Sequence, residues 1–264
     1  MPINKKSQLT SILEEILTFG SKLNYHMTKV SKSLIILIVC TLSFTFVSAQ
    51  ENDSLRKFNS FVGIRFGAAL PMGEFASHEY GYGGYALLGK SFGGEAAWFI
   101  TPKIGFGVDV STNSFGFASG YYVEDYKESE PAFTNIGMLS GQYTLTTYMG
   151  GLYYKATISP KFHSTFKFMG GLFSAKTPNQ LYYVDAFGGL KLNFWKTSAH
   201  SSKLGFLTGA SFEYKLYDQV SLLLQADFTY AGADFNYTTS SASGYTNHLQ
   251  MPVFRLQPGI NIHF

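Results

Sequence analysis

The side chains best suited to acid–base or nucleophilic chemistry are scattered through this sequence. His163 is followed by Ser164, but neighbours on a strand point to opposite faces, so these two cannot form a nucleophile–base pair. His200 precedes Ser201 with no acid nearby, and nothing acidic is close to His248 in the sequence. The remaining histidines after residue 49 are His78 and His263. The sequence therefore predicts no catalytic residues, and we expect that the protein is not an enzyme.

Metal and cofactor sites are not indicated either. The only cysteine, Cys40, lies inside an apolar N-terminal run, so no Cys/His spacing typical of a metal site exists. Gly81, Gly83 and Gly84 lack the strand–turn–helix context of a dinucleotide-binding fingerprint. We expect no metal, no cofactor and no disulfide scaffold.

One set of charged residues does share a pattern, because each lies on the polar face of a segment with alternating hydrophobicity. If the apolar faces contact lipid, these side chains point into a barrel that is only wide enough for its own side chains. We expect them to form ion pairs that fill the interior; a narrow polar path or gate is the alternative. For one of them, Glu95, the alternation breaks near Gly93 and Gly94, which a bulge would explain. The expected interior charges are Arg65, Glu95, Asp109, Lys167, Glu213, Lys215, Asp227 and Arg255.

The elements that position these charges are long strands. In residues 220–230, Val, Leu, Leu, Ala, Phe and Tyr alternate with mostly polar residues, and the same period of two recurs from Phe61 onward. The segments run to about ten residues or more, the length that a tilted strand needs to cross a membrane. Short connections such as 99–104, 158–161 and 216–220 alternate with long polar ones at 71–82, 118–141, 175–203 and 232–249. Short turns at one end and long loops at the other are typical of outer-membrane barrels.

The sequence thus predicts an all-β, antiparallel, up-and-down transmembrane barrel. We expect eight strands, at 60–71, 84–100, 103–118, 141–158, 161–174, 203–217, 219–232 and 250–264. The segment 181–195 also has strand character, so it is either an extension of the third long loop or part of a ten-stranded barrel. Aromatic residues near the short turns would form a girdle at the membrane surface. They are Trp98, Phe99, Tyr153, Tyr154 and Phe264.

The N-terminal region predicts export. A basic stretch from Met27, an apolar run over 34–47 and small residues up to Ala49 together match a secretory signal peptide, with cleavage expected after Ala49. We therefore expect residues 1–26 to be an upstream extension, 27–49 the signal, 50–59 a periplasmic segment and 60–264 the barrel. The five basic and two acidic residues before Gln50 account for the whole net charge of +3, so nothing supports nucleic-acid binding.

The last strand and the first one carry a family resemblance. Phe264, with Ile262 on the same face and Gly259 on the other, resembles the β-signal of outer-membrane barrels. The stretch 63–75 and the Gly-rich 81–89 look like the opening of small barrels of the Bacteroidota, which share an architecture with the OmpA transmembrane domain and OmpX. The resemblance implies an outer-membrane location, contact with membrane lipid, and recognition of the β-signal by the barrel-assembly machinery.

The resemblance implies architecture more than function. We expect a structural or adhesion-like role through the long loops, with an unidentified extracellular partner. A small channel or solute transporter, and a lipid-modifying enzyme, are the alternatives. A soluble lipocalin-like barrel would instead keep charged residues on its outer face.

Overall fold

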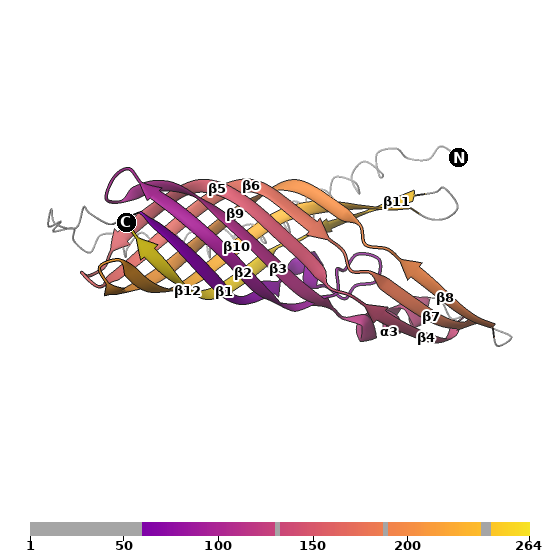
Figure 1. The fold of residues 1–264 in the computed structure, drawn as a ribbon. Helices are drawn as coiled ribbons and strands as arrows, with labels where there is room; N and C mark the ends of the chain where they lie inside the picture. Colours follow the sequence, from indigo (N-terminus) through magenta and orange to yellow (C-terminus); the bar gives the residue numbers. More distant parts are fainter. Residues whose placement is uncertain (1–59, 130–132, 187–189, 239–243) are drawn as a thin grey trace, which may run out of the picture. The chain divides into compact units, whose positions relative to one another are not determined.

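The computed structural model describes residues 60–129, 133–186, 190–238 and 244–264. Eight antiparallel strands form a closed ring in the order β1-β2-β3-β5-β6-β9-β10-β12, and β12 pairs with β1 (Figure 1). The predicted eight-stranded barrel is therefore confirmed. The strands of the ring are β1 (Phe61–Pro71), β2 (Ala86–Phe99), β3 (Ile104–Phe117), β5 (Tyr143–Thr157), β6 (Phe162–Lys176), β9 (His200–Tyr217), β10 (Val220–Thr238) and β12 (Val253–His263).

The ten-stranded alternative is wrong. The segment 181–195 forms a hairpin of β7 (Gln180–Ala186) and β8 (Leu190–Lys196), which pairs with β4 (Phe133–Ser140) in a separate three-stranded sheet. This sheet lies beyond the end of the barrel opposite the C-terminus (Figure 1). Two segments that we expected to be loops, 118–141 and 175–203, thus supply much of an ordered structure outside the barrel.

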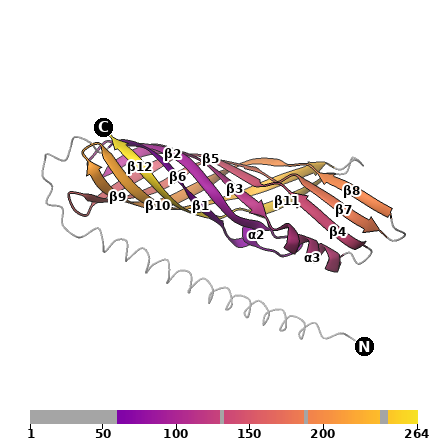
Figure 2. The same ribbon diagram turned by 60° about the horizontal axis from the view of Figure 1, so that its bottom comes forward.

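The other long connections are also partly ordered. The first contains α2 (Gly73–Ala76), and the second begins with α3 (Ser119–Ser129), which contacts β4. The last is shorter than expected, because β10 continues to Thr238 and pairs there with β11 (Gly244–Gln250). Figure 2 shows α2, α3, β4, β7, β8 and β11 gathered at the same end. No helix among the residues described is long and apolar enough to cross a membrane.

The alternation of the sequence becomes an inside and an outside. Along β1 and β12 the exposure alternates residue by residue, so Ile64 and Phe66 face outward while Arg65 is buried. This follows from the two-residue repeat of a strand. Outward apolar side chains form a belt around the ring, and outward polar ones such as Lys90, Thr112 and Ser202 begin above it. An apolar belt of this kind is what a transmembrane barrel presents to lipid.

The expected bulge near Gly93 and Gly94 is not present. Both residues stay in register with Ser111 and Val110 on β3, and the irregularity of β2 lies instead between Ala86 and Gly89. Glu95 points inward without a bulge, because the regular alternation of β2 from Lys90 to Ala97 already places it on the buried face.

The aromatic girdle needs a correction as well. Trp98, Tyr154 and Phe264 are exposed on the outside, and the rings of Trp98 and Phe264 meet edge to face at 5.9 Å. Tyr153 is buried inside the barrel, where its ring packs against Phe61 and Phe99. Neighbours on a strand face opposite sides, so the pair Tyr153–Tyr154 contributes one ring to each side.

Candidate functional site

A network of buried charges crosses the middle of the barrel. Its three cations are Arg65 from β1, Lys167 from β6 and Arg255 from β12; its three carboxylates are Glu95, Asp109 and Asp227 from β2, β3 and β10. All six side chains are at most 3% exposed, and each forms at least one ion pair with another member. Because the cations equal the carboxylates in number, the network is close to neutral, which is how buried charges are accommodated in a protein interior.

Lys167 occupies the central position of this network. Its Nζ lies 2.5 Å from Glu95 Oε2, 2.9 Å from Asp109 Oδ2 and 3.4 Å from Asp227 Oδ2. Arg65 reaches the first two of these acids, at 2.5 Å and 3.3 Å. Arg255 Nη2 lies 2.9 Å from Asp227 Oδ2.

Two of the expected interior charges lie outside the network. Lys215 pairs with Asp218 at 3.1 Å, and its side chain is 26% exposed near the short turn between β9 and β10, so its expected place among the interior ion pairs is wrong. Glu213 is buried but separate: it accepts a hydrogen bond from Thr165 at 3.3 Å and lies 3.6 Å from His263 Nε2.

Uncharged residues that the sequence analysis did not single out complete the network. Gln225 accepts a hydrogen bond from Arg65 Nη1 at 2.5 Å and donates one to Asp227 at 2.6 Å, and Ser111 accepts one from Arg255. Their only signal in the sequence is that they share a strand face with Asp227 and Asp109.

Apolar layers close the barrel on both sides of the charges. Towards the short turns, the rings of Phe61, Phe99 and Tyr153 pack together at 6.1–6.5 Å. Towards the long loops, α2 inserts the fully buried Phe75, whose ring meets Phe115 and Tyr143 edge to face at 5.1 Å from each. The charge network therefore lies between two apolar layers, as expected for a barrel only wide enough for its own side chains.

The residues of the expected assembly signal divide between the two faces. Ile262 and Phe264 are exposed on the outer face. Gly259 lies inside, opposite Arg65 in the ladder, where an added Cβ would come within 2.6 Å of Arg65 Cγ. A glycine here leaves room for the arginine side chain. Recognition of these residues by the assembly machinery stays a prediction.

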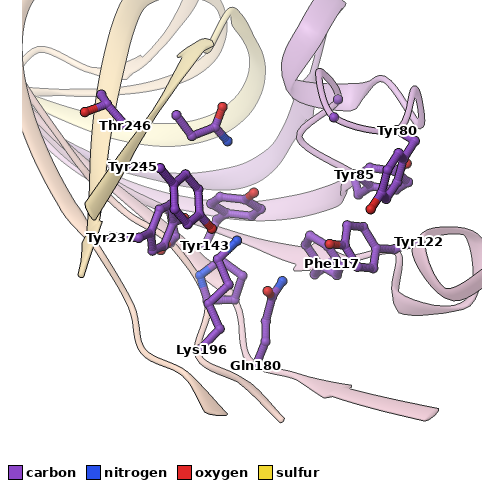
Figure 3. Close-up of a pocket in the computed structure, with 15 residues that line it drawn as sticks. Tyr80, Tyr85, Phe117, Tyr122, Tyr143, Gln180, Lys196, Tyr237, Tyr245 and Thr246 are labelled. Atoms are coloured by element: carbon purple, nitrogen blue, oxygen red, sulfur yellow. The ribbon is translucent and has the colours of Figure 1, made fainter. Parts of the chain in front are cut away.

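A second candidate site lies at the loop end of the barrel. A cavity of about 400 Å³ opens there, lined chiefly by tyrosines from several elements (Figure 3). Tyr85 and Tyr122 stand on one side and Tyr237 and Tyr245 on the other, with Lys196 of β8 reaching between them. We call this the tyrosine pocket; its lining is Tyr80, Gly81, Gly83, Tyr85, Phe117, Tyr122, Tyr143, Thr177, Pro178, Gln180, Lys196, Tyr237, Tyr245, Thr246 and Asn247.

Hydrogen bonds and ring contacts hold the pocket walls in place. Tyr85 donates a hydrogen bond to Asp125 of α3 at 2.5 Å, and Tyr143 donates one to the Gly84 carbonyl at 3.0 Å. Burial raises the pKa of Tyr122 and of Tyr237 above the ordinary tyrosine value, so both phenols stay protonated at physiological pH. No pattern in the sequence indicates this pocket, because its residues come from several separate segments between residues 80 and 247 with no shared period.

The structure brings to His248 an acid that is distant from it in the sequence. Asp234 on β10 is its direct partner in the ladder with β11, and the two side chains are hydrogen-bonded. Lys203 Nζ lies 2.5 Å from the same carboxylate, and Gln250 contacts His248 Nε2 at 3.1 Å. This is an acid–histidine pair without a nucleophile: in the described part of the chain, no hydroxyl is hydrogen-bonded to His248. No cluster of three or more potential metal ligands occurs among these residues either.

A closed eight-stranded barrel with an apolar belt outside and charges inside is the architecture of small transmembrane β-barrel proteins. No protein-family model matches the sequence, and no curated protein matches it. Among solved structures, Neisserial surface protein A is 16% identical, with a TM-score of 0.40, covering 78% of this chain and 97% of its own. The attachment invasion locus protein of Yersinia pestis, Ail, is 13% identical with a TM-score of 0.42, covering 79% and 99%. A major outer membrane protein from Thermus thermophilus is 14% identical with a TM-score of 0.45, covering 78% and 99%.

These likenesses concern the fold alone. The fold is defined by the chain's own closed ring of eight paired antiparallel strands. The signal peptide and its cleavage after Ala49 lie outside the described residues, and they stay predictions.

Proposed function

We propose that this protein is an integral outer-membrane barrel that acts through its extracellular loops, in surface interaction, and not through catalysis or transport. The observation that carries the proposal is the contrast between the barrel interior and the loop end of the barrel. The barrel interior is filled by the charge network and by Phe75, while the loop end carries an ordered sheet, a helix and an open pocket. A filled interior favours a role at the surface over a role in conduction.

The location forms part of the same proposal. The apolar belt supports contact with membrane lipid, and the predicted signal peptide supports export. The exposed Phe264 and Ile262 are consistent with recognition by the barrel-assembly machinery. The resemblance of residues 63–75 to small barrels of the Bacteroidota supports that subtype, with the OmpA transmembrane domain and OmpX as architectural relatives.

Absence of enzyme activity is also proposed. The Asp234–His248 pair joins an acid to a histidine above the belt, but among the described residues His248 contacts the Gln250 amide and no hydroxyl. A lipid-modifying enzyme on this barrel would need a nucleophile beside that histidine. Release of fatty acid from lipopolysaccharide by the purified protein, lost in His248→Ala, would overturn this part of the proposal.

Conductance tests the filled interior. The protein, purified from membranes of cells that express the full chain, is placed in planar bilayers after its heat-modifiable migration has shown that it is folded. We expect no discrete current steps. Reproducible steps that change when Asp227 is neutralised would overturn the proposal in favour of a channel.

A loop exchange tests the surface role. Beads carrying the protein in lipid nanodiscs are passed over surfaces coated with polysaccharides and with matrix proteins. We expect retention on at least one surface, and loss of retention when Gln180–Lys196 is replaced by a short Gly-Ser linker. Retention that is unchanged by this replacement, or absent on every surface for the unmodified protein, would contradict a role for these loops.

A further inference from the structure

We propose that the tyrosine pocket binds a saccharide unit that carries an acidic group. This inference rests on the proposed surface function and names the class of ligand that the loop end would recognise. It is carried by three features of the pocket: aromatic walls, amide and hydroxyl groups among them, and one cation that has no acidic partner among the described residues.

The aromatic walls come from both sides of the cavity. Tyr122 packs against Tyr85 at 5.1 Å and Phe117 at 5.6 Å, so each of these rings is held by its neighbours. On the facing side Tyr237 and Tyr245 stack at 5.1 Å (Figure 3). A sugar ring offers C–H faces that pack on aromatic rings and hydroxyls that need hydrogen bonds. Tyrosine supplies an apolar face and a polar tip on one rigid side chain, and so meets both needs.

Polar groups lie between these walls. The side-chain oxygen of Gln180 accepts a hydrogen bond from Tyr182 at 2.7 Å, which leaves its amide N–H groups to donate. Asn247 also lines the cavity and offers a second amide, and the phenols of Tyr122 and Tyr237 remain protonated donors. A few polar groups set in an otherwise apolar cavity fix the orientation of a bound small molecule.

The charge of the pocket selects the ligand. Among the described residues that line the pocket, Lys196 is the only charged one, and its Nζ lies 4.2 Å from the ring centre of Tyr237 and 5.8 Å from that of Tyr245. Within the described parts of the chain it has no carboxylate partner. The carboxylate of Asp125, behind the wall, already accepts a hydrogen bond from Tyr85. A cation held over two ring faces favours an anion and disfavours a cationic ligand such as a quaternary ammonium.

The volume sets the size of the ligand. About 400 Å³ lies near the lower limit of small-molecule sites, which span about 300–1,000 Å³. The pocket therefore suits one or two sugar rings, and a longer chain would extend into the solvent beyond it.

Calorimetry with a matched pair of probes tests the proposal. Digalacturonic acid carries the carboxylates, and the neutral digalactose of the same linkage lacks them. The full-length protein in nanodiscs should bind the acidic disaccharide, with the neutral one at least about tenfold weaker, because a charge-assisted hydrogen bond is stronger than a neutral one. Lys196→Gln should remove this preference, so that the acidic and the neutral disaccharide bind with similar affinity. Lys191→Gln, on the same strand but outside the lining, is the matched control and should behave as the unmodified protein.

Each outcome decides the matter. Failure of the folded protein to bind the acidic disaccharide overturns the proposal, and so does a preference that survives Lys196→Gln. Either result leaves the proposed surface function intact if the protein gives no current steps in planar bilayers and if bead retention on coated surfaces still depends on Gln180–Lys196. Binding that fits the proposal has two possible sources, which nanodiscs with and without the cell's own lipopolysaccharide distinguish. If lipopolysaccharide in the nanodisc reduces binding of the acidic disaccharide, the natural ligand is an acidic sugar of the cell's own envelope. If lipopolysaccharide does not change this binding, the natural ligand is a foreign glycan.

Discussion

Asp227 and Arg255 are partners in two senses. They are directly opposite each other in the ladder between β10 and β12, and Arg255 Nη2 lies 2.9 Å from Asp227 Oδ2. Glu95 and Asp109 are also directly opposite, between β2 and β3, but both are acids. Like charges opposed across a ladder repel, so this second pair depends on a cation from elsewhere in the ring. Lys167 and Arg65 both supply this positive charge, since each pairs with Glu95 and with Asp109.

Removal of Lys167 should therefore destabilise the barrel strongly. In Lys167→Met, Glu95 and Asp109 keep only Arg65 as a common partner, and a buried charge without a counter-charge costs about 3–5 kcal/mol. The free energy of unfolding, from urea titration of the detergent-solubilised protein, measures the loss. Lys90→Met, on the outer face of β2, is the control and should change it by no more than about 0.5 kcal/mol. Equal stabilities of the two variants would contradict the role given to Lys167.

Gly209 should be needed for the space that the network occupies. It lies opposite both Lys167 and Asp227, and an added Cβ would come within 2.0 Å of Asp227 Oδ1 and 3.1 Å of Lys167 Cε. We expect Gly209→Ala to cost about 1–3 kcal/mol, because the ion pairs must shift. Gly170→Ala is the matched control, since the nearest atom to its added Cβ is 3.9 Å away. The temperature at which each variant loses heat-modifiable migration compares them.

Truncation of the two arginines should open the interior. Arg65 and Arg255 are the largest fully buried side chains in the described structure. Replacement of both by alanine should give discrete current steps in planar bilayers, because water can then enter the gap they leave. The control is Phe66→Ala with Phe254→Ala, which truncates outward residues on the same two strands and should stay silent. Silence of a folded double-arginine variant would show that the apolar layers alone close the barrel.

Acid should loosen the hairpin of β10 and β11. Hydrogen bonds from Lys203 and His248 lower the pKa of Asp234 below its ordinary value. A lowered folded pKa gives stabilisation that is present above the unfolded pKa, about 3.9, and is lost as the pH falls through the folded one. Hydrogen exchange at pH 6 should show more protection of the Gly232–Thr238 amides in the unmodified protein than in Asp234→Asn. Once the pH has fallen below the folded pKa of Asp234 the difference should vanish, and a difference that acid does not reduce would rule out this titration.

The sequence by itself determined the ring of strands. An apolar residue at every second position, as in β10 and β12, forces one face into lipid and the other into the interior, and this local rule holds whatever the partner strand is. Eight strands, their approximate bounds and the inward direction of Arg65, Asp109 and Asp227 could all be read in this way. By the same rule, the consecutive residues Tyr153 and Tyr154 face opposite sides of the strand. Only one of them can therefore belong to the outer aromatic girdle.

Only the tertiary structure decided which residues meet. Lys167 pairs with Glu95, which is 72 residues away in the sequence. Asp234 contacts His248 only because β10 extends beyond the ring and pairs with β11. Such contacts depend on strand register and barrel closure, which local periodicity does not encode. The tyrosine pocket depends on them most, because Tyr85, Tyr122 and Tyr245 lie in separate loops and come together only when the ring closes.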